Sequence, residues 1–72
     1  MSHAMNSAAA LTRALELARA DGWDTDEYEE PVVERDGKDW IVLFQGRSGR
    51  PGDHFMVVLN ASSGAGRVVA GR

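Results

Sequence analysis

The sequence predicts an α+β fold in which one N-terminal helix packs on one face of a three- to four-stranded antiparallel meander sheet of order 1-2-3-4. Two observations predict it. Residues 8–20 are good helix formers with apolar side chains three and four apart, and the rest of the chain divides into short apolar runs separated by glycine-containing turns. The length of 72 residues suits one domain, so we expect residues 7–72 to form it and residues 1–6 to be a disordered or tag-like N-terminus.

The predicted helix extends from Ala8 to Ala20. Asn6 and Ser7 can both cap its first turn, and Gly22 is the natural residue for a left-handed termination near Asp21. The expected core-facing stripe follows the helical repeat. It consists of Ala8, Leu11, Leu15 and Ala18, widened by Ala14 and Leu17.

A hairpin is expected next. Pro31 opens a short strand, Val32–Arg35, and Asp36-Gly37 then separates it from a second strand, Lys38–Gln45. The Asp-Gly pair favours a tight turn with positive φ at both central residues.

The second half of the chain predicts two more strands. Residues 46–53 contain three glycines and a proline, which is typical of a long loop. His54–Asn60 reads as the third strand, a polar turn with positive φ at Gly64 follows, and Arg67–Ala70 reads as a short fourth strand. Consecutive antiparallel strands usually lie side by side, which gives the expected order.

Both faces of the two central strands are apolar, because side chains alternate across a strand. One face carries the larger, aromatic set of Trp40, Val42, Phe44, Phe55, Val57 and Leu59. The other face carries Ile41, Leu43, Met56 and Val58. We expect the aromatic set to face the helix and the second set to form a partner interface, in a homodimer or with another protein, because one helix can cover only one face. The alternative is that the helix covers more of the sheet, or that arginine stems lie across its back.

The charges are unevenly distributed. Six of the eleven acidic residues lie within residues 21–30, and half of the eight basic residues follow residue 46: Arg47, Arg50, Arg67 and Arg72. Such a run usually forms a solvated loop, but it can also steer a basic partner. The net charge of −3 disfavours a nucleic-acid partner, and no apolar stretch is long enough to span a bilayer, so we expect no membrane partner and a cytoplasmic location.

Catalytic and metal-binding patterns are weak, and we expect neither an enzyme nor a cofactor. The chain has no cysteine and two histidines, too few for an ordinary zinc site. Asp24 and Asp26 begin like a calcium loop, but Tyr28 and Glu29 occupy positions that need a ligand and a glycine.

An alternative function uses the glycine-rich loop 46–53. Arg47, Arg50 and His54 could bind a small anion there or serve an enzymatic site. The glycine spacing, however, matches neither the dinucleotide-binding pattern nor the P-loop, and no helix follows it.

Three stretches carry a resemblance to small helix-plus-meander modules of bacteria. They are Ala-Asp-Gly at 20–22, Asp-Gly-Lys-Asp-Trp-Ile-Val-Leu-Phe at 36–44 and Gly-Asp-His-Phe-Met-Val-Val-Leu-Asn-Ala-Ser-Ser-Gly at 52–64. Residues 8–72 resemble the PepSY-like group and the short immunity-protein family with a nuclear-transport-factor-like fold. Trp40, Val42, Phe44 and Gly64 match those families' positions, whereas Asn60 and Ser63 replace the usual Asp and Thr. The resemblance implies the fold and a binding or inhibitory role, and it brings no catalytic residues.

Overall fold

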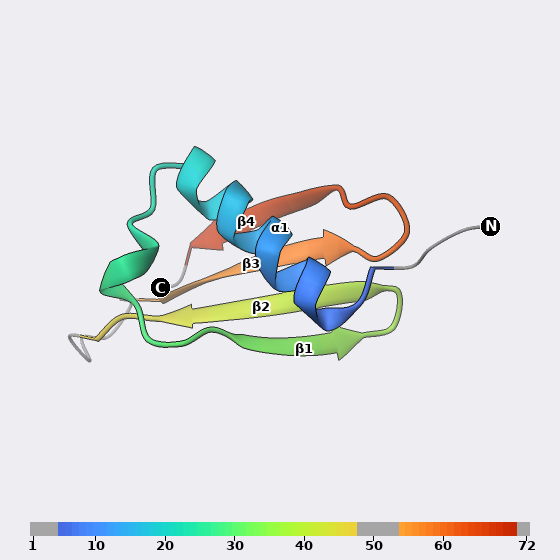
Figure 1. Ribbon diagram of the computed structural model, residues 1–72, viewed down its shortest axis with the longest axis horizontal. Coiled ribbons are helices and arrows are strands. Elements are labelled where there is room, and N and C mark those ends of the chain that lie inside the picture. Colours follow the sequence, from blue (N-terminus) through green and yellow to red (C-terminus); the bar gives the residue numbers. More distant parts are fainter. Residues whose placement is uncertain (1–4, 48–53, 71–72) are drawn as a thin grey trace.

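The computed structural model describes residues 5–47 and 54–70 and contains a helical layer on a four-stranded antiparallel sheet. Its elements are α1 (Ser7–Ala20), the 3-10 turn η1 (Thr25–Glu27), β1 (Val32–Asp36), β2 (Asp39–Gln45), β3 (His54–Asn60) and β4 (Gly66–Ala70). The strand order is β1-β2-β3-β4, and α1 crosses one face of the sheet and contacts all four strands (Figure 1). The predicted fold class and strand order are confirmed.

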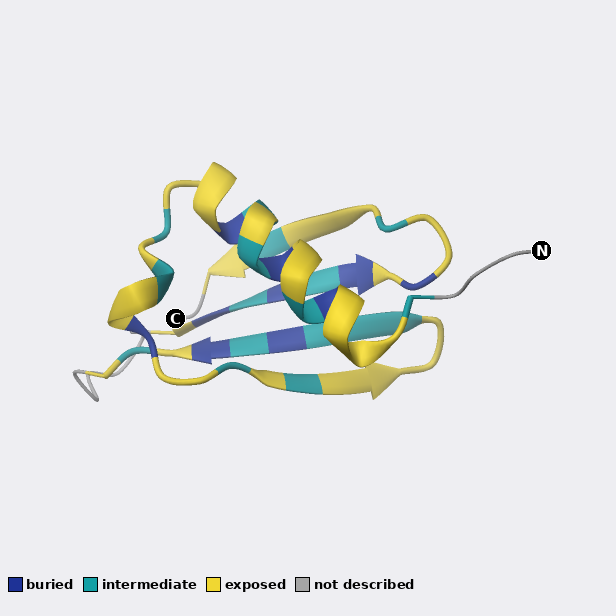
Figure 2. Ribbon diagram, viewed as in Figure 1, coloured by how far each residue is buried: buried dark blue, intermediate teal, exposed yellow. Residues whose placement is uncertain are grey.

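The strand register places the expected aromatic set beneath the helix, on the side that we call the front face. Val42 lies opposite Val33 on β1 and Val57 on β3, and Phe44 lies opposite Phe55. The fully buried positions of β2 and β3 alternate along each strand (Figure 2). They are Val42, Phe44, Phe55, Val57 and Leu59.

The helix presents alanine to the core. Ala10, Ala14 and Ala18 are completely buried, so the predicted stripe is right at Ala14 and Ala18. It missed Ala10 and wrongly included Ala8, which is exposed. Leucine side chains flank this alanine seam and are half-buried: Leu11, Leu15 and Leu17. Because alanine is short, the helix backbone can come close to the aromatic rings of the sheet, and the longer leucines reach the core from the sides.

Local contacts hold the ends of α1. Asn6 is the N-cap, and its Oδ1 accepts a hydrogen bond from the Ala9 amide at 2.8 Å. Gly22 follows the last turn with a φ of 93°, as expected for a left-handed termination. Residues 1–4 of the predicted N-terminal segment lie outside the described residues. Met5 donates its amide to the Ala61 carbonyl at 3.0 Å.

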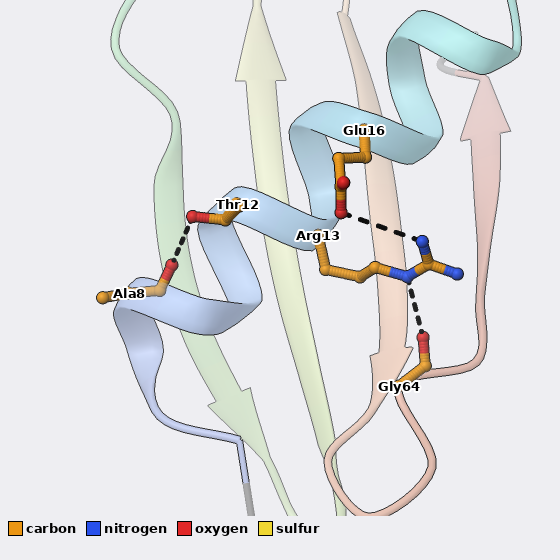
Figure 3. Close-up of polar contacts among 5 residues, drawn as sticks. All are labelled: Ala8, Thr12, Arg13, Glu16 and Gly64. Atoms are coloured by element: carbon orange, nitrogen blue, oxygen red, sulfur yellow. Dashed lines mark hydrogen bonds and ion pairs between the residues drawn. The ribbon is translucent and has the colours of Figure 1, made fainter.

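The middle of α1 is tied to the turn between β3 and β4. Arg13 Nε donates to the Gly64 carbonyl oxygen at 3.3 Å, and its Nη1 lies 3.8 Å from Glu16 Oε1 (Figure 3). Thr12 Oγ1 donates to the Ala8 carbonyl at 3.1 Å within the helix. Both partners of the ion pair are largely exposed, so the pair adds little stability and the backbone contact at Gly64 is the long-range tie.

The connector between α1 and β1 closes one end of the core with aromatic rings. Trp23 stacks on Phe55 with ring centroids 4.3 Å apart, and Tyr28 meets the same ring edge-on at 5.0 Å. Phe44 stacks on Phe55 from the neighbouring strand, at 4.5 Å. Trp23 and Tyr28 therefore belong to the core.

The β1–β2 turn differs from the predicted one. Asp36 pairs with Asp39, so the two central residues are Gly37 and Lys38. Only Gly37 has a positive φ, at 59°, which is the pattern of a type II′ turn rather than one with two positive φ angles. The register makes Gly37 the first central residue of the turn, and a type II′ turn needs a positive φ at that position alone.

Candidate functional site

The back face of the sheet, opposite α1, carries apolar side chains in two neighbouring rows. The first row runs across all four strands, and each member pairs with the next: Val32, Leu43, Met56 and Val69. The second row has apolar residues on the central strands and charged residues on the edges: Glu34, Ile41, Val58 and Arg67. We call the six apolar residues of these rows the apolar patch. It contains all four predicted interface residues.

The apolar patch is accessible from outside the molecule. Val32 is 55% exposed and Val69 is 36% exposed, and they are the large hydrophobic residues that the described part of the chain leaves most open. The four residues on β2 and β3 are half-buried, and none of them packs against the core beneath α1. The other described elements are α1, on the front face, and η1, which contacts α1. No described helix or strand therefore covers the back face.

The size of the apolar patch follows from sheet geometry. With strands about 4.8 Å apart and same-face residues about 6.8 Å apart along a strand, the six apolar residues cover about 200 Å² of the sheet. The largest apolar patch of a typical monomeric protein is somewhat larger, about 300–600 Å², and is often functional. The alternative that the helix covers more of the sheet does not apply to the back face, because α1 lies on the front face (Figure 1).

Polar residues border the apolar patch at both ends of the strands. Asp36, Asp39 and Asn60 share the next row toward the β1–β2 turn, and Gln45 and His54 pair at the opposite end. Next to the first of these borders lies a shallow, open hollow of about 320 Å³. Its lining consists of Asp39, Val58, Asn60, Ala65, Gly66 and Arg67. The hollow is thus continuous with the apolar patch through Val58.

Only part of the predicted ligand site lies within the described residues. Arg47 and His54 are both exposed and lie at the same end of the sheet, where Gln45 pairs with His54. Arg50 lies outside the described residues. The hollow described above contains neither Arg47 nor His54.

Acidic residues of the connector serve the backbone and a neighbouring side chain. Asp24 Oδ1 accepts from the Asp26 amide at 3.2 Å at the start of η1, and Asp21 Oδ2 accepts from Trp23 Nε1 at 2.9 Å. Within residues 5–47 and 54–70, no group of three or more histidine, cysteine, aspartate or glutamate side chains is placed to hold a metal ion. In the same part of the chain, no helix combines the length and apolarity needed to cross a membrane.

Sequence reasoning missed the outer members of the back face. Val32 and Glu34 could have been found from the alternation in β1 once its register with β2 was known. Arg67 and Val69 needed the β3–β4 register, which depends on where the turn at 61–65 ends. The four central residues were found because their runs are apolar without interruption.

Comparisons with models of protein families, with curated protein sequences and with solved structures find no significant match to this chain.

Proposed function

We propose that this protein is a non-enzymatic interaction module that docks against another protein surface through the apolar patch. One observation carries the proposal: apolar side chains form a continuous row across all four strands, on a face that no described element covers. The buried residues beneath α1 already form a core of ordinary composition, and the residues of the apolar patch are not part of it.

Burial energetics favour an occupied back face. Moving an aliphatic side chain fully out of water stabilises by about 1.5–3 kcal/mol. The residues of the apolar patch on β2 and β3 already have part of this stabilisation, because their neighbours in the sheet half-bury them. Val32 and Val69 are more exposed and have the least of it. A flat partner surface would complete the burial of all six residues together.

The surroundings of the apolar patch have the anatomy of an interface. Protein interfaces combine an apolar centre with a polar, solvated rim. Here the centre lies on β2 and β3, and Glu34 and Arg67 stand on the edge strands beside it. The resemblance to bacterial immunity modules implies a binding or inhibitory role, which agrees with a docking face rather than a catalytic cleft.

A substitution at Leu43 tests the proposal by comparison with its neighbour Val42 on the opposite face. We expect Leu43→Glu to remain folded, with about 1 kcal/mol or less of lost stability, because its side chain lies outside the packed core. Val42→Glu should unfold the protein, because Val42 is completely buried. Urea denaturation followed by circular dichroism measures both.

Association provides the second readout. Sedimentation velocity and light scattering over a concentration series should show that Leu43→Glu weakens association, whereas Ala9→Glu does not. Ala9→Glu adds the same charge on the exposed outer side of α1. If Leu43→Glu costs as much stability as Val42→Glu and leaves association unchanged, the back face belongs to the fold of the single chain and the proposal is wrong.

A further inference from the structure

The acidic and basic residues of the back face lie on opposite halves of the sheet. The half formed by β1 and β2 carries three acidic residues and no base: Glu34, Asp36 and Asp39. The half formed by β3 and β4 carries Arg67 and His54 and no acid. Within the described residues, neither Glu34 nor Arg67 forms an ion pair or a side-chain hydrogen bond.

We propose that the partner on the back face is a second copy of this chain, related by a twofold axis that runs parallel to the strands between β2 and β3. This inference rests on the proposed function, since it names the occupant of the same surface. Such an axis exchanges the two halves, so β1 of one copy lies over β4 of the other and β2 lies over β3. The acidic half of each copy then faces the basic half of its partner.

The register determines which side chains meet in this arrangement. In the second row, Glu34 of each copy faces Arg67 of the other, and Ile41 faces Val58. In the first row, Leu43 faces Met56, and the exposed valines of the edge strands face each other. The apolar patch is thereby closed on itself, and an ion pair stands on each side of it.

The hollow is complementary to the same arrangement. It lies mainly on the β3–β4 half, where Asn60 and Arg67 can donate hydrogen bonds, and Asp39 of β2 completes its polar lining. The twofold axis places Glu34 and Asp36 of the second copy over it. The donors Asn60 and Arg67 of one copy therefore meet the acidic residues Glu34 and Asp36 of the other.

Other twofold arrangements match the surface less well. An axis across the strands would place the row containing Glu34 and Arg67 over the fully apolar row, so both charges would lose water without gaining a partner. Pairing through the open edges, β1 with β1 or β4 with β4, would leave the apolar patch uncovered. Of these three arrangements, the axis along the strands alone satisfies the apolar and the charged residues together, and it agrees with the small crossing angle, about 30°, of aligned packed sheets.

The area indicates a weak dimer. The two rows and their polar borders hold 13 paired residues, which cover about 420 Å² of each copy, or about 850 Å² in total. Stable protein interfaces usually bury about 1,200–2,000 Å². We therefore expect association at protein concentrations between about 10 µM and 1 mM.

Charge reversal tests the arrangement, because the two rim pairs can be broken and restored separately. Glu34→Arg and Arg67→Glu should each weaken self-association at least about tenfold, since each creates two like-charged pairs per dimer. An equimolar mixture of the two variants should regain the wild-type affinity, because both pairs between unlike chains are again of opposite charge. Sedimentation equilibrium of the separate and mixed variants measures this.

The control for net charge is Arg47→Glu, which changes the charge as Arg67→Glu does at an exposed position outside the two rows, and which should leave association unchanged. Recovery in the mixture also shows that both variants are folded. If Leu43→Glu abolishes association but the mixture does not recover, the back face is the docking surface and the strand-parallel axis is wrong. If the wild-type protein stays monomeric at about 1 mM, the second copy is not the occupant. The stability comparison of Leu43→Glu with Val42→Glu then judges the proposed function by itself.

Discussion

Replacing Gly66 with alanine should destabilise this protein, although removing a glycine ordinarily reduces the entropy of the unfolded chain and stabilises by about 0.4–1 kcal/mol. Gly66 begins β4, pairs with Leu59 on β3, and has no positive φ that would require glycine. The reason for the glycine is space. A Cβ atom at this position would lie 2.8 Å from Leu17 Cδ1 and 2.9 Å from the Val58 carbonyl oxygen, and it would collide with Leu59 Cδ2.

The size of the effect depends on whether these neighbours can move. A Cβ atom essentially never lies within 3.0 Å of such a neighbour, so all three contacts are too short. Leu59 is completely buried, and the Val58 carbonyl belongs to the sheet backbone, so neither moves freely. Overpacking of this kind costs about 1–3 kcal/mol. After the entropic gain, we expect Gly66→Ala to lose about 1–2 kcal/mol, which corresponds to a fall in Tm of about 5–15 °C for a domain of this size.

Urea and thermal denaturation followed by circular dichroism measure the change, and a double-mutant cycle with Leu17→Ala identifies its cause. Leu17→Ala should lessen the cost of Gly66→Ala by about 0.5 kcal/mol or more, because it removes one colliding methyl group. An alanine variant as stable as the wild type, or more stable, would show that α1 and Leu59 move aside easily. The close approach of α1 to β4 would then not limit the residue at position 66.

Two further predictions concern the N-terminal end of the domain. Asn6→Ala should reduce the free energy of unfolding by about 0.5–2 kcal/mol in urea denaturation, since it removes the acceptor for the Ala9 amide. Asn6→Ser should retain most of the stability, because serine can also cap a helix. If the wild type and both variants are equally stable, the side chain of Asn6 does not stabilise α1. Trp40→Phe removes the indole group that donates to the Met5 carbonyl at 3.0 Å. The substitution should speed hydrogen exchange of the Met5 amide, which donates to the Ala61 carbonyl. An unchanged exchange rate would contradict a role of Trp40 in holding Met5 in place.

Local signals in the sequence were sufficient for the order and the type of α1 and the four strands, whereas η1 was not predicted. Asn6 and Gly22 mark the two ends of α1 through chemistry that acts within a few residues. The uninterrupted apolar run 55–59 with its polar neighbours His54 and Asn60 indicated the bounds of β3, and alternation assigned the aromatic residues to the buried face. The β1–β2 turn type was missed because it depends on which residues pair across the hairpin, and Asp36 with Asp39 shifts the turn by one residue.

The sequence by itself determined that this chain forms a helix and a meander with more apolar strand surface than one helix can cover. Only the tertiary structure decided which residues share the uncovered face, because each row combines residues from four strands and depends on three separate registers. Glu34 and Arg67 lie far apart in the chain and carry no local signal of their relation, yet pairing through Ile41 and Val58 places them in one row at opposite edges. Patterns of neighbouring residues report the faces of single strands, whereas the distribution of charge over a whole sheet exists only after the strands are aligned.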